Sequence, residues 1–314
     1  MIHKIILPTP FAVGDVNSFL MKGDTLSLVD AGPKTPEAYA ALEHGIKEAG
    51  YSFSDIEQVI LTHHHPDHAG WIDAFDGATV LGHTYNDLWL KRDDDFFKYH
   101  DTFYLERLIE EGVPEEYLFW VKRMKRSVVL MGERPLDRLL AEGDVLPGHE
   151  GWTVMETPGH AQSHLVFWNE QTGEMIGGDL VLEKVSSNPL IEPPLDPKMG
   201  RPRSLLQYNA SLKRLLTLPV DIIYSGHGNE VRNIHALIEN RLVKQRERAM
   251  KVLAMMDGGP RTIFELTKEL FPAVYEKELG LTLSETIGQT DYLVDEGLVV
   301  ETRDEGGVYH YEQA

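Results

Sequence analysis

The feature that most constrains this chain is a cluster of histidines placed directly after a short apolar segment. Residues 59–61 (Val-Ile-Leu) predict a buried strand, which is followed by the run Thr62-His63-His64-His65-Pro66-Asp67-His68. Burying so many polar side chains without partners would be costly, and metal coordination removes that cost. In an extended segment alternate side chains share a face, so His63 and His65 can bind one ion while His64 points away. The last two residues of the run can reach a second ion. The alternative is a solvated polar loop or a His-rich surface tract.

Three later segments each place a ligand-type residue in a glycine-containing turn after a predicted strand. They are Thr157-Pro158-Gly159-His160, Gly177-Gly178-Asp179 and Ser225-Gly226-His227-Gly228. Glycine permits tight turns and close backbone approach, so single side chains from distant segments can converge on one point. Each segment alone would more often be structural, but together with the histidine run they predict a metal centre.

Composition limits the partners and the metal ligands. The formal net charge is −20, from 50 acidic against 30 basic side chains, so the mean field of the protein repels nucleic acid and anionic membranes. With 0 cysteines, imidazole and carboxylate are the ligands on offer, and the chain suits a reducing compartment. No stretch approaches the ~20 apolar residues of a membrane span. We therefore expect a cytoplasmic protein with a small-molecule substrate, either anionic or linked to a carrier, and we leave a homo-oligomer open.

The pattern of elements predicts an α/β catalytic domain over residues 1–235. Strands are predicted at 5–7, 18–22, 25–30, 59–61, 152–156, 165–168, 174–177 and 221–224, and helices at 35–49, 204–216 and 233–256. A helical, aromatic-rich cap is predicted as an insertion over about 84–140, and a proline-rich loop spans 186–202. Loops this long in compact domains are often functional.

A second unit is predicted at residues 258–314, joined to the first by a linking helix over 236–257. Asp257-Gly258-Gly259-Pro260 breaks the linking helix, and Thr262 with Glu265 forms a capping box that opens the next one. A further helix is predicted at about 284–296, followed by a hairpin over 298–302 and 308–311. Two helices followed by a hairpin are typical of a winged helix.

The ligand pattern resembles that of the metallo-β-lactamase superfamily. The motif His-x-His-x-Asp-His matches residues 63–68, and the later ligands follow in the family's order. The match spans about residues 1–235 and implies a four-layer αβ/βα sandwich. By resemblance, one metal would bind to His63, His65 and His160, the other to Asp67, His68 and His227, and Asp179 would bridge them. Val29-Asp30-Ala31-Gly32 looks like the family's first motif, in which Asp30 supports the site; a purely structural turn role is equally open.

Departures within the superfamily narrow the chemistry. Asp179 stands where secreted zinc β-lactamases have a cysteine ligand, and His65 stands where flavin-linked di-iron relatives have glutamate. The set instead resembles that of glyoxalase II, lactonases, phosphodiesterases and the ribonuclease branch. Two ions about 3.5 to 4 Å apart would share a water, lower its pKa toward about 7 and polarise the scissile bond. The expected nucleophile is a bridging hydroxide, with Asp67 orienting it and shuttling its proton. Zinc is favoured, with iron and manganese as alternatives.

Several functions fit such a site. The leading hypothesis is hydrolysis of an acyl thioester or lactone, and the runner-up is a phosphodiesterase or ribonuclease. Further alternatives are a nucleic-acid-binding regulator that uses the metal domain as a sensor, and a mononuclear-iron persulfide oxygenase. The C-terminal unit resembles the lactamase-like endoribonuclease and thioesterase branch, which permits RNA. Residues 258–314 nevertheless carry twelve acidic against four basic side chains. We therefore predict that this unit binds no nucleic acid and packs on the catalytic domain or a second subunit.

Other candidate residues have simpler interpretations. His164 is predicted to support the site rather than to bind metal, Tyr208 to pack, and Asn188 to form a turn before a proline. Two basic clusters could hold an anionic substrate: Lys122, Arg123, Lys125 and Arg126, and Lys198, Arg201 and Arg203. For the first cluster, favourable placement at a helix C-terminus is the alternative.

Overall fold

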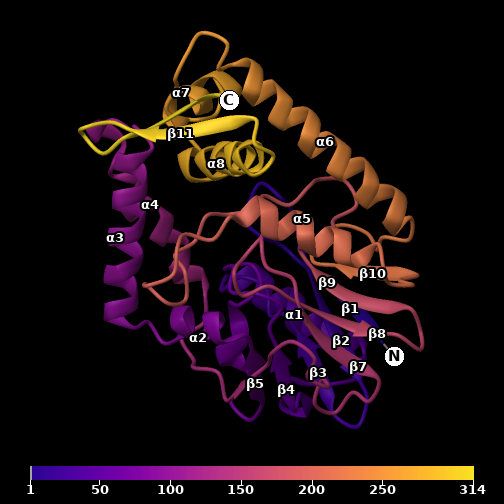
Figure 1. The fold of residues 1–314 in the computed structure, drawn as a ribbon. Coiled ribbons are helices and arrows are strands. Elements are labelled where there is room, and N and C mark those ends of the chain that lie inside the picture. The colour runs from indigo at the N-terminus through magenta and orange to yellow at the C-terminus, as the bar shows by residue number, and fades with distance from the viewer. Residues whose placement is uncertain (1) are drawn as a thin grey trace.

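Two β-sheets pack face to face in the computed structural model, which describes residues 2–314 (Figure 1). The first sheet has the order β1-β2-β3-β4-β5-β6, and β3 to β6 are parallel. Its strands are β1 (Ile2–Leu7), β2 (Val16–Lys22), β3 (Leu26–Val29), β4 (Gln58–Ile60), β5 (Thr79–Gly82) and β6 (Arg138–Leu139). The second sheet, in the order β10-β9-β8-β7, consists of β7 (Trp152–Glu156), β8 (Leu165–Asn169), β9 (Glu174–Gly178) and β10 (Ile222–Ser225).

Helices cover the outer face of each sheet. Helix α1 (Pro36–Glu48) begins at Thr35, whose side chain accepts a hydrogen bond from the Ala38 amide, and it buries Leu42 and Ile46 against the first sheet. Helices α5 (Ser204–Leu215) and α6 (Ile234–Ala254) cover the second sheet, where Tyr208 and Leu212 are buried. Apolar side chains of both sheets fill the space between them. The predicted four-layer α/β sandwich is confirmed.

The predicted insertion is mostly helical. It contains α2 (Thr84–Leu90), α3 (Asp94–Glu110) and α4 (Trp120–Met124), with short 3₁₀ turns at Glu115–Tyr117 and Lys125–Leu130. Two further 3₁₀ turns, Phe53–Asp55 and Trp71–Ala74, precede the insertion. The helical prediction is wrong at its end, where β6 pairs with β5. Both residues of β6 are exposed at the sheet edge, so they carry no apolar alternation that would reveal a strand.

The C-terminal elements are α7 (Ile263–Leu270), α8 (Leu279–Asp295), β11 (Val299–Arg303) and β12 (Tyr309–Gln313). The capping box is confirmed, because Thr262 accepts from the Glu265 amide and Glu265 accepts from the Thr262 amide. Helix α8 begins earlier than predicted, at a position where no side chain caps it. The winged-helix assignment and the domain boundaries remain predictions.

The C-terminal elements pack against the insertion and the catalytic layers. Their core is shared with residues of α3 and α4, and α8 lies against α5 and α6 (Figure 1). Ion pairs join the surfaces: Arg201 Nη1 lies 2.7 Å from Asp291 Oδ2, and Arg248 Nη1 lies 2.7 Å from Glu285 Oε1. Since Arg201 already has a carboxylate partner, this member of the second basic cluster is not free to bind an anion.

We expect Arg201→Met to lower the free energy of unfolding by about 3 to 5 kcal/mol, because it leaves Asp291 largely buried without its partner. Arg203→Met is the matched control: Arg203 is half-exposed and lies 3.9 Å from Asp295, so its removal should cost about 0 to 1 kcal/mol. Urea unfolding followed by circular dichroism measures both. Equal stabilities for the two variants would contradict the prediction.

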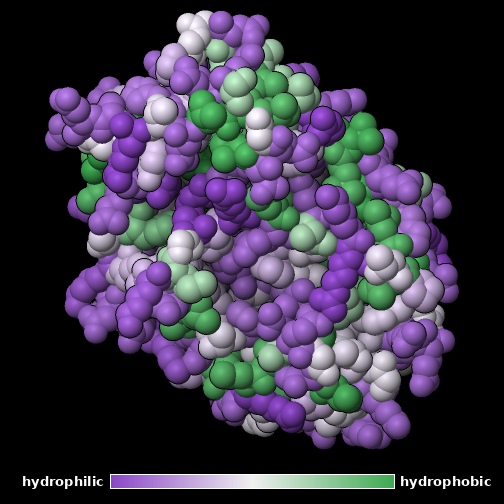
Figure 2. Space-filling view, in the orientation of Figure 1, coloured by the Kyte–Doolittle hydropathy of each residue, from purple (hydrophilic) through white to green (hydrophobic). Residues whose placement is uncertain are grey.

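No helix within residues 2–314 combines the length and apolar character needed to cross a membrane. On the face drawn in Figure 2, hydrophilic residues dominate and hydrophobic ones form small separate patches.

Candidate metal centre

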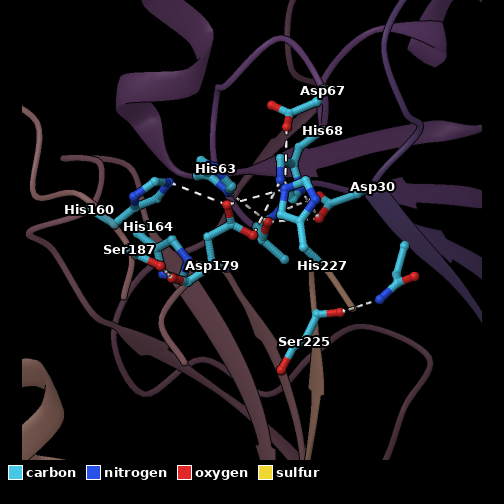
Figure 3. Close-up of polar contacts among 12 residues, drawn as sticks. Asp30, His63, Asp67, His68, His160, His164, Asp179, Ser187, Ser225 and His227 are labelled. Atoms are coloured by element: carbon cyan, nitrogen blue, oxygen red, sulfur yellow. Dashed lines mark hydrogen bonds and ion pairs between the residues drawn. The ribbon is translucent and has the colours of Figure 1, made fainter. Parts of the chain in front are cut away.

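The predicted ligands converge at one edge of the sandwich, where several strands end, and Figure 3 labels all of them except His65. The histidine run follows β4, and His160 lies in the turn between β7 and β8. Asp179 directly follows β9, and His227 comes two residues after β10. Since the ends of strands from both sheets meet here, short glycine-containing turns suffice to bring the side chains together.

Two groups of candidate ligands form within this edge. The ligand atoms of His63, His65 and His160 lie within 4.8 Å of one another, and those of Asp67, His68 and His227 do the same. Asp179 lies between the groups, with Oδ1 3.5 Å from His68 Nε2 and Oδ2 3.5 Å from the Nε2 atoms of both His160 and His227. The structure therefore brings all seven predicted residues together, with Asp179 between the two groups.

The histidines present unpartnered nitrogens to the centre. The Nε2 atoms of His63, His65, His68, His160 and His227 are buried and have no hydrogen-bond partner in the described part of the chain. The opposite nitrogen, Nδ1, is held in four of them: His63 by Thr62 Oγ1 (3.0 Å), His68 by Asp30 Oδ2 (2.8 Å), His160 by the Asn188 carbonyl (2.9 Å) and His227 by the Asp15 carbonyl (2.8 Å). Carbonyl and carboxylate oxygens only accept, and the Thr62 hydroxyl already donates to Asp30. In each of these neutral rings Nδ1 therefore carries the hydrogen and Nε2 keeps its lone pair. Such a donor set fits divalent metal ions.

The charges of the site differ between its two halves. Burial holds the pKa values of His63 and His65 well below the usual range, so these rings are neutral and able to bind metal. Burial alone would raise the pKa of Asp179, but His227 and His68 outweigh it and hold that pKa well below its usual value. Conversely, burial opposes the charge on His68, yet Asp179 and Asp30 raise its pKa. The carboxylate-rich half therefore attracts positive charge most strongly.

Asp30 serves both of the roles that its sequence left open. Its backbone turns with φ = 58°, and its Oδ1 accepts from the Thr62 amide at 2.8 Å. Its Oδ2 accepts from Thr62 Oγ1 and from His68 Nδ1, both at 2.8 Å. Asp30 thereby orients the candidate ligand His68 by holding Nδ1, the ring nitrogen that points away from the centre.

We expect Asp30→Asn to weaken zinc affinity by about 10- to 100-fold, because the new amide group could meet the Nδ1 hydrogen of His68 as a second donor. Competition titration against a chromophoric chelator measures the affinity. Asp76→Asn, an exposed residue on the 75–78 turn, is the control and should bind zinc like the parent. An unchanged affinity in the Asp30 variant would remove Asp30 from the metal site.

His64 points away from the centre, as the alternation predicts. Its Nε2 lies 2.9 Å from Glu192 Oε1, its Nδ1 lies 2.8 Å from Ser163 Oγ, and its ring stacks on Trp89 with centroids 4.8 Å apart. Glu192 also lies 4.0 Å from His65 Nε2. This buried carboxylate was missed in the sequence, because a single glutamate in a proline-rich loop gives no signal of its burial.

The remaining candidates have supporting positions. His164 Nε2 accepts a hydrogen bond from the Asp179 amide at 3.0 Å. Burial lowers the pKa of His164 to about 3, so a neutral ring positions the Asp179 backbone. Tyr208 packs in the core and donates to the Leu180 carbonyl. Asn188 contributes through its backbone, which sequence patterns cannot reveal. In the first basic cluster, Lys125 pairs with Asp101 at 2.6 Å.

Comparisons with known proteins identify the family of the chain. Residues 12–227 match the family model described as the metallo-beta-lactamase superfamily. The chain is 45% identical over 308 residues to the "Probable metallo-hydrolase YqjP" of Bacillus subtilis (strain 168), covering 97% of this chain and 96% of that protein. It is 40% identical over 163 residues to a hydroxyacylglutathione hydrolase of Cereibacter sphaeroides, covering 50% of this chain and 59% of that enzyme. A crystal structure of a metallo-beta-lactamase family protein from Thermus thermophilus aligns with a TM-score of 0.81 and 29% identity, over 100% of this chain and 98% of that one.

Proposed function

The chain belongs to the metallo-beta-lactamase superfamily and is a metallo-hydrolase, and we propose that it binds two zinc ions and cleaves acyl thioesters or lactones. The observation that carries the proposal is the position of Asp179 between two three-residue ligand groups, within 3.5 Å of a histidine of each. One carboxylate with its two oxygens so placed can bridge a pair of ions. The absence of cysteine from the sequence leads us to propose the cytoplasm as the location.

The residues of the site divide the chemical work. When bound, two divalent ions supply an activated water and polarise the bond to be cleaved. His63, His65 and His160 would hold one ion with neutral rings, while Asp67, His68 and His227 would hold the other. Asp67 Oδ2 lies 3.3 Å from His227 Nε2 at the centre, and we assign Asp67 the role of orienting the attacking water and accepting its proton.

Support for a thioester or lactone comes from the ligand set and from one relative. Asp179 in the bridging position and His65 in the second motif position are the features that resemble glyoxalase II and the lactonases. Half of the chain is also 40% identical to a hydroxyacylglutathione hydrolase, an enzyme named for an acyl derivative of glutathione. The same metal geometry could serve phosphodiester cleavage, so direct measurement must separate the two.

The test is a substrate panel on zinc-loaded protein of verified metal content. The panel contains acyl thioesters of glutathione, simple lactones, an activated phosphodiester and single-stranded RNA. We expect two zinc ions per chain and turnover of a thioester or lactone. Faster cleavage of the phosphodiester or RNA would replace the proposal with the nuclease alternative, and a single iron per chain in the protein as purified, before zinc is added, would favour the oxygenase.

We further predict that the protein binds neither RNA nor DNA. Helix α8, where a groove-reading helix would lie, is largely buried, and its Glu285 and Asp291 are paired with Arg248 and Arg201. Few basic groups remain there to contact phosphates. Titration of labelled single-stranded RNA and duplex DNA into the whole protein at about 0.1 M salt should show no binding at micromolar concentrations. Tight binding that weakens steeply with salt would contradict this prediction.

A further inference from the structure

A cavity lies beside the metal centre, and none of the seven candidate ligands lines it. Its volume is about 570 Å³, and it is lined by the loop 185–188, by one face of α6 and by residues of the C-terminal unit. Asn188 belongs to its wall, while the carbonyl of the same residue holds His160. A single residue, Asn188, therefore connects the cavity wall to the candidate ligand His160.

A buried guanidinium on α6 lacks a carboxylate partner. Arg241 lines the cavity and is 6% exposed. Its Nη2 donates to the carbonyls of Leu182 and Val185, but its Nη1 has no hydrogen-bond partner, and no ion pair to it occurs within residues 2–314. Burial accordingly lowers its pKa. A buried charge without an opposite charge is costly, even when carbonyl dipoles offset part of that cost.

The next basic residue along α6 is also free. Lys244 lines the same cavity one turn after Arg241, and it forms no ion pair with any residue that the structure describes. Arg248, a further turn on, is neutralised by Glu285 at 2.7 Å. Against these two cations the cavity wall carries one carboxylate without an ion pair among the described residues, that of Glu278. The excess of positive charge, in a chain with a net charge of −20, favours an anion as occupant.

The opposite wall of the cavity carries apolar side chains, together with the carboxylates of Glu278 and Glu285, of which Glu285 is paired with Arg248. Phe271, Val274 and Leu281 of the C-terminal unit line it, and the last two are more than 40% exposed. Leu281 is also joined to the loop, because the Asn188 side chain donates to its carbonyl at 3.1 Å. An occupant that fits both walls has a charged group and an apolar part.

We propose that this cavity binds an amphipathic anion, with a phosphate or carboxylate group beside Arg241 and Lys244 and an apolar part against the Phe271 wall. The anion places a negative charge near the buried guanidinium of Arg241, and the exposed Lys244 donates charge-assisted hydrogen bonds to it. Because Asn188 lies between the cavity and His160, the occupant also braces the loop that orients a metal ligand. The site requires no hydrolytic activity, so it is testable independently of the proposed function.

The probe is n-hexyl phosphate, titrated by calorimetry into the zinc-loaded protein, with inorganic phosphate for comparison. We expect hexyl phosphate to bind more tightly than inorganic phosphate, because the apolar wall contacts its alkyl chain. Lys244→Met should weaken this binding by about tenfold, and Arg241→Met should also weaken it, because it removes a nearby positive charge. Lys251→Met is the control, since Lys251 is exposed on the same helix and lies outside the cavity wall.

The variants separate this cavity from the zinc ions, which can also bind phosphate. If hexyl phosphate bound only at zinc, its affinity would be the same in the parent and in Lys244→Met, and that result would overturn the proposal. Absence of binding at about 10 mM ligand would overturn it as well. Should Arg241→Met fail to fold, the exposed Lys244 still provides the test. Competition by hexyl phosphate against an anionic thioester would identify the occupant as part of the substrate, and non-competitive behaviour would identify a separate molecule; either supports an anion site.

Discussion

Replacing Asp179 by alanine is expected to lower kcat/KM by at least about a thousandfold, which corresponds to roughly 4 kcal/mol of transition-state stabilisation. Asp179 is the one predicted ligand that lies between both groups, with its oxygens 3.5 Å from His68, His160 and His227. Without it the two proposed metal positions lose their shared carboxylate. The half of the site that contains His68 and His227 also loses the carboxylate that raises the pKa of both rings and attracts positive charge there. We therefore also expect the zinc content to fall below two per chain.

The measurements are steady-state kinetics on the best substrate of the panel and metal analysis after dialysis. Asp221→Ala is the matched control, since Asp221 is an exposed aspartate just before β10 and should leave both values unchanged. Circular dichroism establishes that the Asp179 variant is folded. Full turnover by that variant, with two zinc ions present, would refute the dinuclear model.

The convergence of the candidate ligands could be predicted from the sequence because each one directly follows a strand or sits in a glycine-containing turn. The histidine run is contiguous, so the alternation of an extended segment already separates His64 from His63 and His65. The structure bears this out, since His64 bonds to Glu192 and Ser163 instead of facing the centre. Asp179 could be placed because it follows β9 after two glycines.

The supports of the ligands could be predicted only in part. Asp30 was a candidate because it is an aspartate in a recognisable motif, whereas the partners of His160 and His227 are the backbone carbonyls of Asn188 and Asp15. Every residue has a carbonyl, so no residue type marks these positions. Their identity depends on how the long loops fold, which is set by tertiary contacts.

The acidic C-terminal unit shows a similar limit. From the sequence, its excess of carboxylates indicated a surface that repels nucleic acid. In the structure several of these carboxylates have partners on other elements: Asp291 pairs with Arg201, Glu285 with Arg248, and Glu296 with Arg246 at 3.0 Å. The sequence gives the number of carboxylates, but only the fold shows that some of them form ion pairs that hold α8 against other elements.

The second large effect is expected from a single methyl group. A Cβ atom on Gly226 would lie 2.2 Å from Asp179 Oδ1 and 2.8 Å from His68 Cε1, far inside van der Waals contact. The backbone cannot easily retreat, because the Gly226 amide donates to the Gly178 carbonyl and the Gly226 carbonyl accepts from the Asn17 amide, both at 2.7 Å. Asp179 must therefore move away from the bridging position.

We expect Gly226→Ala to lower kcat/KM by at least about a hundredfold, since displacement of a reacting group by about 1 Å has effects of that size. Zinc content should fall as well, because the displaced carboxylate is the shared ligand. Gly77→Ala is the control: no atom lies within 4 Å of its added methyl group and its backbone is not left-handed. Kinetics and metal analysis of both variants decide the matter. If Gly226→Ala kept two zinc ions and parental turnover, the bridging position of Asp179 would not be needed for catalysis, and the proposed role of Asp179 would be wrong even though its carboxylate is so close.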